Sequence, residues 1–146
     1  MKKILVIGLI SGFFSAGAFA AACDGAGGPQ TAGSATPGAG ETCVCNGKTA
    51  VKSTVNGGKS GVITTPRFLQ TGFDVQCSAN TLVSYNEVSG VAFAVASGSV
   101  KGNRTFKGST AGGGVAEAGK CPATGCTGAT EVSSALTAAV AEATSS

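Results

Sequence analysis

Residues 42–57 read TCVCNGKTAVKSTVNG, and this stretch carries the strongest fold signal in the chain. Its two Asn-Gly dipeptides, Asn46-Gly47 and Asn56-Gly57, favour tight hairpin turns because both residue types tolerate a positive φ. Between them, Lys48–Val55 places two valines on one face and lysines with a threonine on the other, which predicts a strand. We therefore expect a β-meander over Thr42–Thr65.

Further segments show the two-residue period of a strand. In Val91–Ala96 the larger side chains Val91, Phe93 and Val95 share one face with only alanines between them, which predicts a strand buried on at least one side. The expected strands are Lys48–Val55, Gly61–Thr65, Phe73–Cys77, Leu82–Val88, Val91–Ala96 and Arg104–Lys107. Short strands at this spacing predict a mainly β fold, a small antiparallel sheet or sandwich stabilised by disulfides.

The chain changes character towards its end. Thr110–Gly128 is rich in glycine and is expected to be loop, including the Gly112–Gly114 run. From Glu131 to Ala143 small apolar residues recur every three to four positions, which predicts a weakly apolar helix with Thr130 as its N-cap.

The first residues have the layout of a bacterial secretory signal peptide. Two lysines precede Ile4–Phe14, an apolar run of 11 residues that is too short to span a bilayer, and Ala18-Phe19-Ala20 offers a cleavage site. No second apolar run long enough to cross a membrane follows. We expect a secreted protein, extracellular or at the cell surface, with the periplasm as the other open destination.

Composition divides the chain into four parts. They are a signal peptide at 1–20, a Gly/Ala/Pro-rich arm at 21–42, a β domain at 43–128, and a C-terminal helix and tail at 129–146. The arm has no large apolar side chain over Asp24–Glu41, so it is either flexible or an irregular surface segment.

Six cysteines in an exported chain predict a disulfide framework. Cys43 and Cys45 are two residues apart on a predicted strand, so their side chains are expected on one face, where they cannot easily bond each other. One consistent set of the fifteen joins Cys121 to Cys126 and gives Cys43 and Cys45 to Cys23 and Cys77.

Two other roles for these cysteines are less favoured. A metal site is disfavoured because the chain has no histidine and no CxxC pair. Lipidation of Cys23 is disfavoured because the preceding alanines match a lipid-attachment box poorly and because five cysteines would remain.

Charge and motifs argue against several partners. Cleavage removes two of ten basic residues and none of seven acidic ones, which leaves 8 − 7 = +1, too little for a nucleic-acid face. Gly57-Gly58-Lys59-Ser60 ends like a phosphate loop, but Ser53 stands where the first glycine is required. We expect no cofactor.

The usual catalytic arrangements are missing from the sequence. Without histidine, a Ser-His-Asp or Cys-His arrangement is impossible. Asp74 and Glu87 are the only carboxylates in the expected sheet, and two solvent-facing strand charges are a more common reading than a glycosidase pair. We therefore expect no enzyme.

These observations favour a structural role. We expect a subunit that assembles with copies of itself into an extracellular filament, a pilus-like fibre (fimbrium) or a surface matrix. The alternative is a monomeric secreted adhesin or glycan-binding module that uses Tyr85, Asn86 and Glu87. A small hydrolase or an inhibitor of another secreted protein is a third reading.

Overall fold

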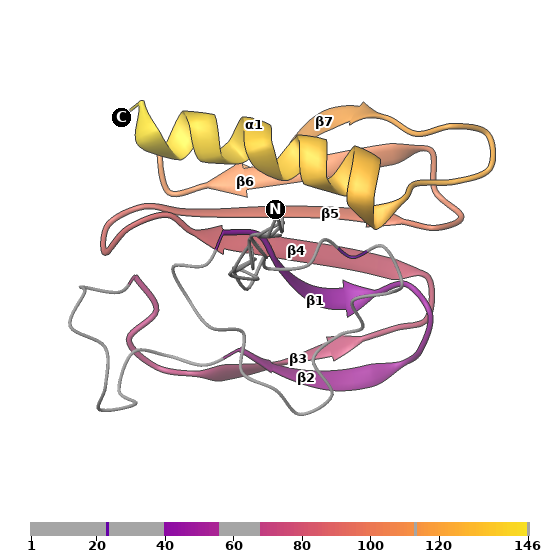
Figure 1. Ribbon diagram of the computed structural model, residues 1–146, viewed down its shortest axis with the longest axis horizontal. Coiled ribbons are helices and arrows are strands. Elements are labelled where there is room, and N and C mark those ends of the chain that lie inside the picture. Colours follow the sequence, from indigo (N-terminus) through magenta and orange to yellow (C-terminus); the bar gives the residue numbers. More distant parts are fainter. Residues whose placement is uncertain (1–22, 24–39, 56–67, 113, 146) are drawn as a thin grey trace, which may run out of the picture.

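A computed structural model describes residue 23 and residues 40–55, 68–112 and 114–145 (Figure 1). Its elements are β1 (Thr42–Asn46), β2 (Val51–Val55), β3 (Phe73–Cys77), β4 (Thr81–Glu87), β5 (Phe93–Ser99), β6 (Arg104–Ser109), β7 (Ala116–Lys120), the π-helical turn η1 (Gly128–Val132) and α1 (Ser133–Thr144). Five strands form an antiparallel sheet in the order β1-β4-β5-β6-β7, and β2 and β3 pair separately. The expected mainly β fold with a C-terminal helix is confirmed.

Several predictions fall outside the described residues. They are the signal peptide at 1–20, nearly all of the arm at 21–42, the turn at Asn56-Gly57, the Gly57–Ser60 segment and the strand Gly61–Thr65. Within the described ranges, no helix is both long and apolar enough to cross a bilayer.

A β-bulge in β1 determines which layer each neighbouring cysteine reaches. Cys43 is opposite Ser84 in β4, Cys45 is opposite Val83, and the ladder shifts at Val44 between them. Because Ser84 and Val83 are adjacent residues of a strand, they point to opposite faces of the sheet. Cys43 and Cys45 therefore also point to opposite faces, and the expectation that they share one face is wrong.

The helix layer packs on the face that carries Cys43. Ala94 and Ala96 of β5 and Leu82 of β4 are buried there against Leu136 and Ala139 of α1. α1 crosses in front of the strands in Figure 1, chiefly over β5 and β6. Small side chains on both surfaces let the helix approach the sheet closely.

The β2–β3 hairpin packs on the other face, at the β1 end of the sheet. Cys45, Val55, Cys77 and Tyr85 form its buried cluster. The hydroxyl of Ser53 in β2 donates a 2.8 Å hydrogen bond to the carbonyl oxygen of Val44. The bulge thus exposes a carbonyl that the hairpin satisfies.

The chain has three disulfides, of which Cys45–Cys77 joins the five-stranded sheet to the hairpin layer. Cys23 bonds Cys43 on the helix side, Cys45 bonds Cys77 on the hairpin side, and Cys121 bonds Cys126, with Cα–Cα distances of 5.1, 5.5 and 4.8 Å. The Cys121–Cys126 bond agrees with the prediction, and of the two ways to join Cys43 and Cys45 to Cys23 and Cys77 that the sequence left open, the structure has Cys23–Cys43 and Cys45–Cys77. Three disulfides are typical of an oxidising compartment such as the periplasm or the extracellular space.

The expected meander over Thr42–Thr65 is wrong where β1 meets β2, because these strands belong to different sheets. Gly47 has the positive φ expected of the turn, at 75°. Its carbonyl, however, accepts a hydrogen bond from Asn80 N–H in the β3–β4 turn, at 3.0 Å. Because of this hydrogen bond, the backbone after Gly47 does not turn back along β1, and β2 begins only at Val51.

The assignment of the whole Thr110–Gly128 segment to loop is also wrong, because Ala116–Lys120 forms β7. Its alanines and glycine have little intrinsic strand preference. β6 supplies a partner, and Cys121 N–H donates to the carbonyl of Asn103 at 2.9 Å next to the Cys121–Cys126 bridge. Tertiary pairing therefore overrides local propensity here.

In β5 the most buried face carries the alanines and not the larger side chains, which the sequence pattern had placed on the buried side. The alanines are the fully buried side chains, whereas Val91 precedes the strand and is 83% exposed. The reason is the helix layer, which packs on the alanine face, while Phe93 and Val95 border the hairpin cluster.

The helix starts earlier than expected, and its cap is Thr127 rather than Thr130. The Thr127 hydroxyl accepts a hydrogen bond from Thr130 N–H, and the Glu131 carboxylate accepts from both Thr127 N–H and the Thr127 hydroxyl at 2.7 Å. These hydrogen bonds lower the pKa of Glu131, since they favour its ionised form. A Cβ at Gly128 would overlap the backbone of Cys23, which explains the glycine beside the cap.

The lengths of the loops that the disulfides close predict different costs for removing them. Cys45→Ala/Cys77→Ala opens a separation of 32 residues and is expected to lower the free energy of unfolding by about 3–4 kcal/mol. Cys121→Ala/Cys126→Ala opens a separation of 5 and should cost only about 2 kcal/mol. Urea unfolding of both double variants measures the difference, and equal losses would contradict the dependence on loop length.

The Glu131 cap predicts a pH dependence of stability. The folded pKa lies below the unfolded one, so the contribution of Glu131 is complete above the unfolded value near 4.5 and is lost as the pH falls through the folded value. Glu131→Gln should therefore reduce the free energy of unfolding more at pH 7 than at pH 3. Urea titrations at both pH values test this, and a penalty that is the same at both would refute it.

Candidate functional site

The most distinctive surface is one face of β5, β6 and β7, which we call the uncovered face. α1 packs on the opposite side of these strands, and the hairpin lies at the other end of the sheet, next to β1 (Figure 1). Phe106 in β6 is 43% exposed on this face, and Val115, just before β7, is 76% exposed. Among the described residues, no element packs over them as a layer.

Gly108 joins the apolar residues of the uncovered face into a strip. A Cβ built at Gly108 would lie 3.6 Å from Cγ1 of Val95 and 3.9 Å from Cγ2 of Val115. Gly108 is two residues from Phe106 in the same strand, so both face the same side. The strip therefore runs from Phe106 across Gly108 to the two valines.

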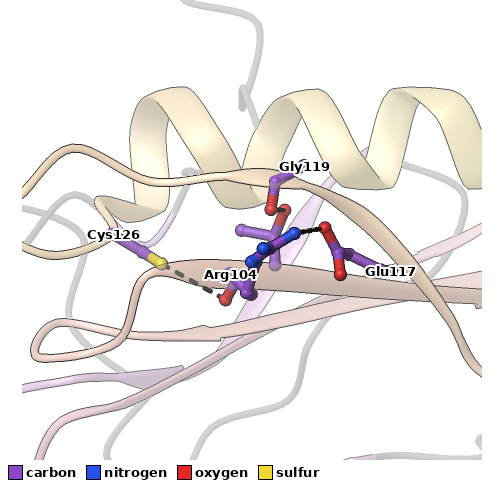
Figure 2. A network of polar contacts seen from close by, with 5 residues as sticks. Arg104, Glu117, Gly119 and Cys126 are labelled. Atoms are coloured by element: carbon purple, nitrogen blue, oxygen red, sulfur yellow. Dashed lines mark hydrogen bonds and ion pairs between the residues drawn. The ribbon is translucent and has the colours of Figure 1, made fainter.

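Charged side chains border this strip at the end of β6 and β7. Arg104 forms an ion pair with Glu117 across the two strands, as Figure 2 shows. Lys120 is the register partner of Arg104, and Glu117 is that of Phe106, so the side chains of Glu117 and Lys120 share the uncovered face. The backbone of Arg104 is held beside the Cys121–Cys126 bridge, with Cys126 Sγ 3.4 Å from its carbonyl oxygen.

A shallow depression of about 330 Å³ lies between Phe106 and the β5–β6 turn. Its polar lining consists of hydroxyl groups, including those of Ser97 and Ser99, one amide and the guanidinium of Arg104. A carboxylate is not among its lining residues, so it offers no acid–base pair.

An aromatic stack lies at the far end of β4 and β5. Phe93 stacks on Phe68 and on Tyr85, with ring centroids 5.3 Å apart in both pairs. Of the residues expected in a glycan-binding module, Tyr85 and Glu87 are buried, at 3% and 5% exposure, so neither presents its side chain on the surface.

The two candidate carboxylates do not form a pair on neighbouring strands. Asp74 is in β3 and Glu87 is in β4, and these strands belong to different sheets. Hydrogen bonds from Lys52 and Thr54 lower the pKa of Asp74, at 2.7 and 2.8 Å. The Glu87 carboxylate instead accepts the N–H of Leu69 at 3.0 Å. Each carboxylate thus has a structural role of its own.

Other reactive chemistry is also scarce in the part of the chain that the structure describes. Nowhere in it do three metal-ligating side chains come together. All six cysteines, Cys23, Cys43, Cys45, Cys77, Cys121 and Cys126, are in disulfides, so they offer no thiol nucleophile.

Sequence reasoning missed the uncovered face because it missed β7. Without a strand after Ser109, Phe106 reads as part of an edge strand and Val115 as a loop residue. The one available signal was the Glu117–Lys120 spacing next to the alanines, which is too weak to predict a strand alone.

Searches against protein-family models, curated proteins and solved structures return no match to this chain. The functional argument therefore depends on its own surface.

The uncovered face predicts that Phe106 contributes little to folding. Phe106→Thr keeps a strand-favouring side chain and should lower the free energy of unfolding by less than about 1 kcal/mol. Leu82→Ala, in the buried helix-side cluster, should cost about 2–5 kcal/mol. Urea unfolding of the two variants tests this comparison, which fails if Phe106→Thr is the more costly change.

Proposed function

We propose that this protein is an exported structural subunit that associates with copies of itself through the uncovered face, forming an extracellular filament, fibre or surface matrix. The observation that carries this proposal is the apolar strip on the uncovered face, in which Phe106 and Val115 are exposed and continue into the half-buried Val95. Contiguous exposed apolar surface on a folded domain is a common mark of an interaction site.

Charge supports association between identical chains. After removal of residues 1–20 the net charge is 8 − 7 = +1, so copies repel each other weakly. The strip itself contains no charged side chain, and the charges at its border include the Arg104–Glu117 ion pair. Two copies can therefore bring their strips together without burying an unpaired charge.

The disulfides support a role outside the cell. All three join cysteines of the same chain, so they stabilise the subunit and leave the contacts between copies non-covalent. A small subunit with few aromatic residues gains from such cross-links where no cellular machinery can refold it. We place the assembly at the cell exterior on this ground.

Association should be visible directly in the purified, oxidised protein without residues 1–20. Negative-stain electron microscopy should show regular fibres or sheets, and sedimentation should show mass that rises with concentration. Reduction should disperse these assemblies because subunits without their disulfides lose the packed sheet. Dispersed small particles in both samples would refute the proposal and favour a monomeric binding module.

The contribution of the strip is tested by exchanging its side chains. Phe106→Thr/Val115→Thr should weaken association at least about tenfold, because it removes the two most exposed apolar side chains of the uncovered face. Val91→Thr is the control, since Val91 is exposed to a similar degree as Val115, 83% against 76%, but lies in the β4–β5 connection. If both changes weaken association equally, the uncovered face is not the surface through which copies associate.

A further inference from the structure

The outer edge of the sheet at β7 is a second interaction surface. β7 is the last strand in the order of the sheet and pairs only with β6 among the described residues. Its side chains are small or exposed: Ala116, Glu117 and Lys120 are exposed, and Ala118 and Gly119 are partly so. An edge of this kind presents backbone donors and acceptors to another strand.

The direction of the backbone groups can be read from one hydrogen bond. Cys121 N–H donates inward to the carbonyl of Asn103 at 2.9 Å. Successive residues of a strand alternate the side to which their N–H and C=O groups point. The N–H and C=O of Lys120 therefore point outward, away from β6. No proline interrupts β7, so no backbone N–H is missing from the edge. The ladder with β6 has a β-bulge at Ala118, which places Glu117 on the same face as Lys120 although three positions separate them.

We infer that β7 pairs antiparallel with β7 of a second copy across a two-fold axis, so that the two sheets become one. Charge complementarity identifies the second copy as the occupant. Glu117 and Lys120 lie on one face of the sheet because their partners in β6 are two residues apart. In antiparallel self-pairing, Glu117 of each copy then lies opposite Lys120 of the other, which forms two ion pairs.

The other edge of the sheet does not compete for this contact. Residues Thr42–Cys45 of β1 are buried, whereas β7 is open, so a head-to-tail pairing of β7 with β1 has no accessible partner strand. Pairing at β7 is therefore isologous and closes after two copies. This inference rests on the proposed function, because it supplies one of the contacts through which the subunit associates.

Charge exchange at the two positions tests the register. Lys120→Glu places two carboxylates opposite each other in each half of the contact and should raise the dissociation constant of the dimer about tenfold. Glu117→Lys should do the same through facing ammonium groups. An equimolar mixture of Lys120→Glu and Glu117→Lys restores both ion pairs between unlike chains, so it should associate at least as tightly as the unaltered protein.

Sedimentation velocity over a concentration series in low and moderate salt measures each sample. Lys101→Glu, in the exposed β5–β6 turn, is the matched control for net charge and should leave association unchanged. Circular dichroism checks whether both variants fold. If Glu117→Lys does not fold because the new lysine faces Arg104, the comparison of Lys120→Glu with Lys101→Glu alone tests the β7 contact.

The outcomes separate this inference from the proposed function. If the unaltered protein stays monomeric at every concentration, the proposed function fails and the β7 contact fails with it. If the unaltered protein associates but Lys120→Glu associates equally well, only the β7 contact is overturned. Weaker association of both single variants with recovery in the mixture supports it.

Discussion

The β-bulge at Val44 is the constraint on which the three-layer arrangement depends. In a regular strand, Cys43 and Cys45 would share a face, and both disulfides would reach the same layer. The extra residue sends Cys43 to the helix side and Cys45 to the hairpin side. One short strand is thereby cross-linked to Cys23 on the helix side and to Cys77 of the hairpin on the other, and the carbonyl that the bulge frees is satisfied by Ser53.

Small residues make the second part of this arrangement possible. Ala94, Ala96 and Ala139 meet between β5 and α1 where larger side chains would hold the helix away. A Cβ at Gly98 would lie 3.1 Å from Cγ2 of Val132, tighter than ordinary packing. Such a core buries little apolar area per residue, so covalent links contribute a large share of the stability.

The sequence predicted the class of the fold, most strands and the helix because these depend on local periodicity. It mispredicted what depends on contacts between distant residues. β7 is a strand because it pairs with β6. The path of the chain after Asn46-Gly47 depends on the hydrogen bond between Gly47 and Asn80. Cys43 and Cys45 point to opposite faces because of a register shift that their spacing does not predict. The uncovered face was missed for the same reason, since it exists only once β7 is in place.

The geometry of the sheet also constrains the assembly that we propose. A two-fold axis that joins two β7 edges is perpendicular to the sheet, so the uncovered faces of both copies lie on one side of the joined sheet. The helices of both copies then lie on the other side. Two such pairs that meet face to face in exact alignment close into a particle. If the two pairs are offset along the sheet, part of each uncovered face stays free, and further pairs can add to it. In the assembly that we propose, the offset between facing sheets, more than the chemistry of the strip, therefore decides whether the product is a particle or a fibre.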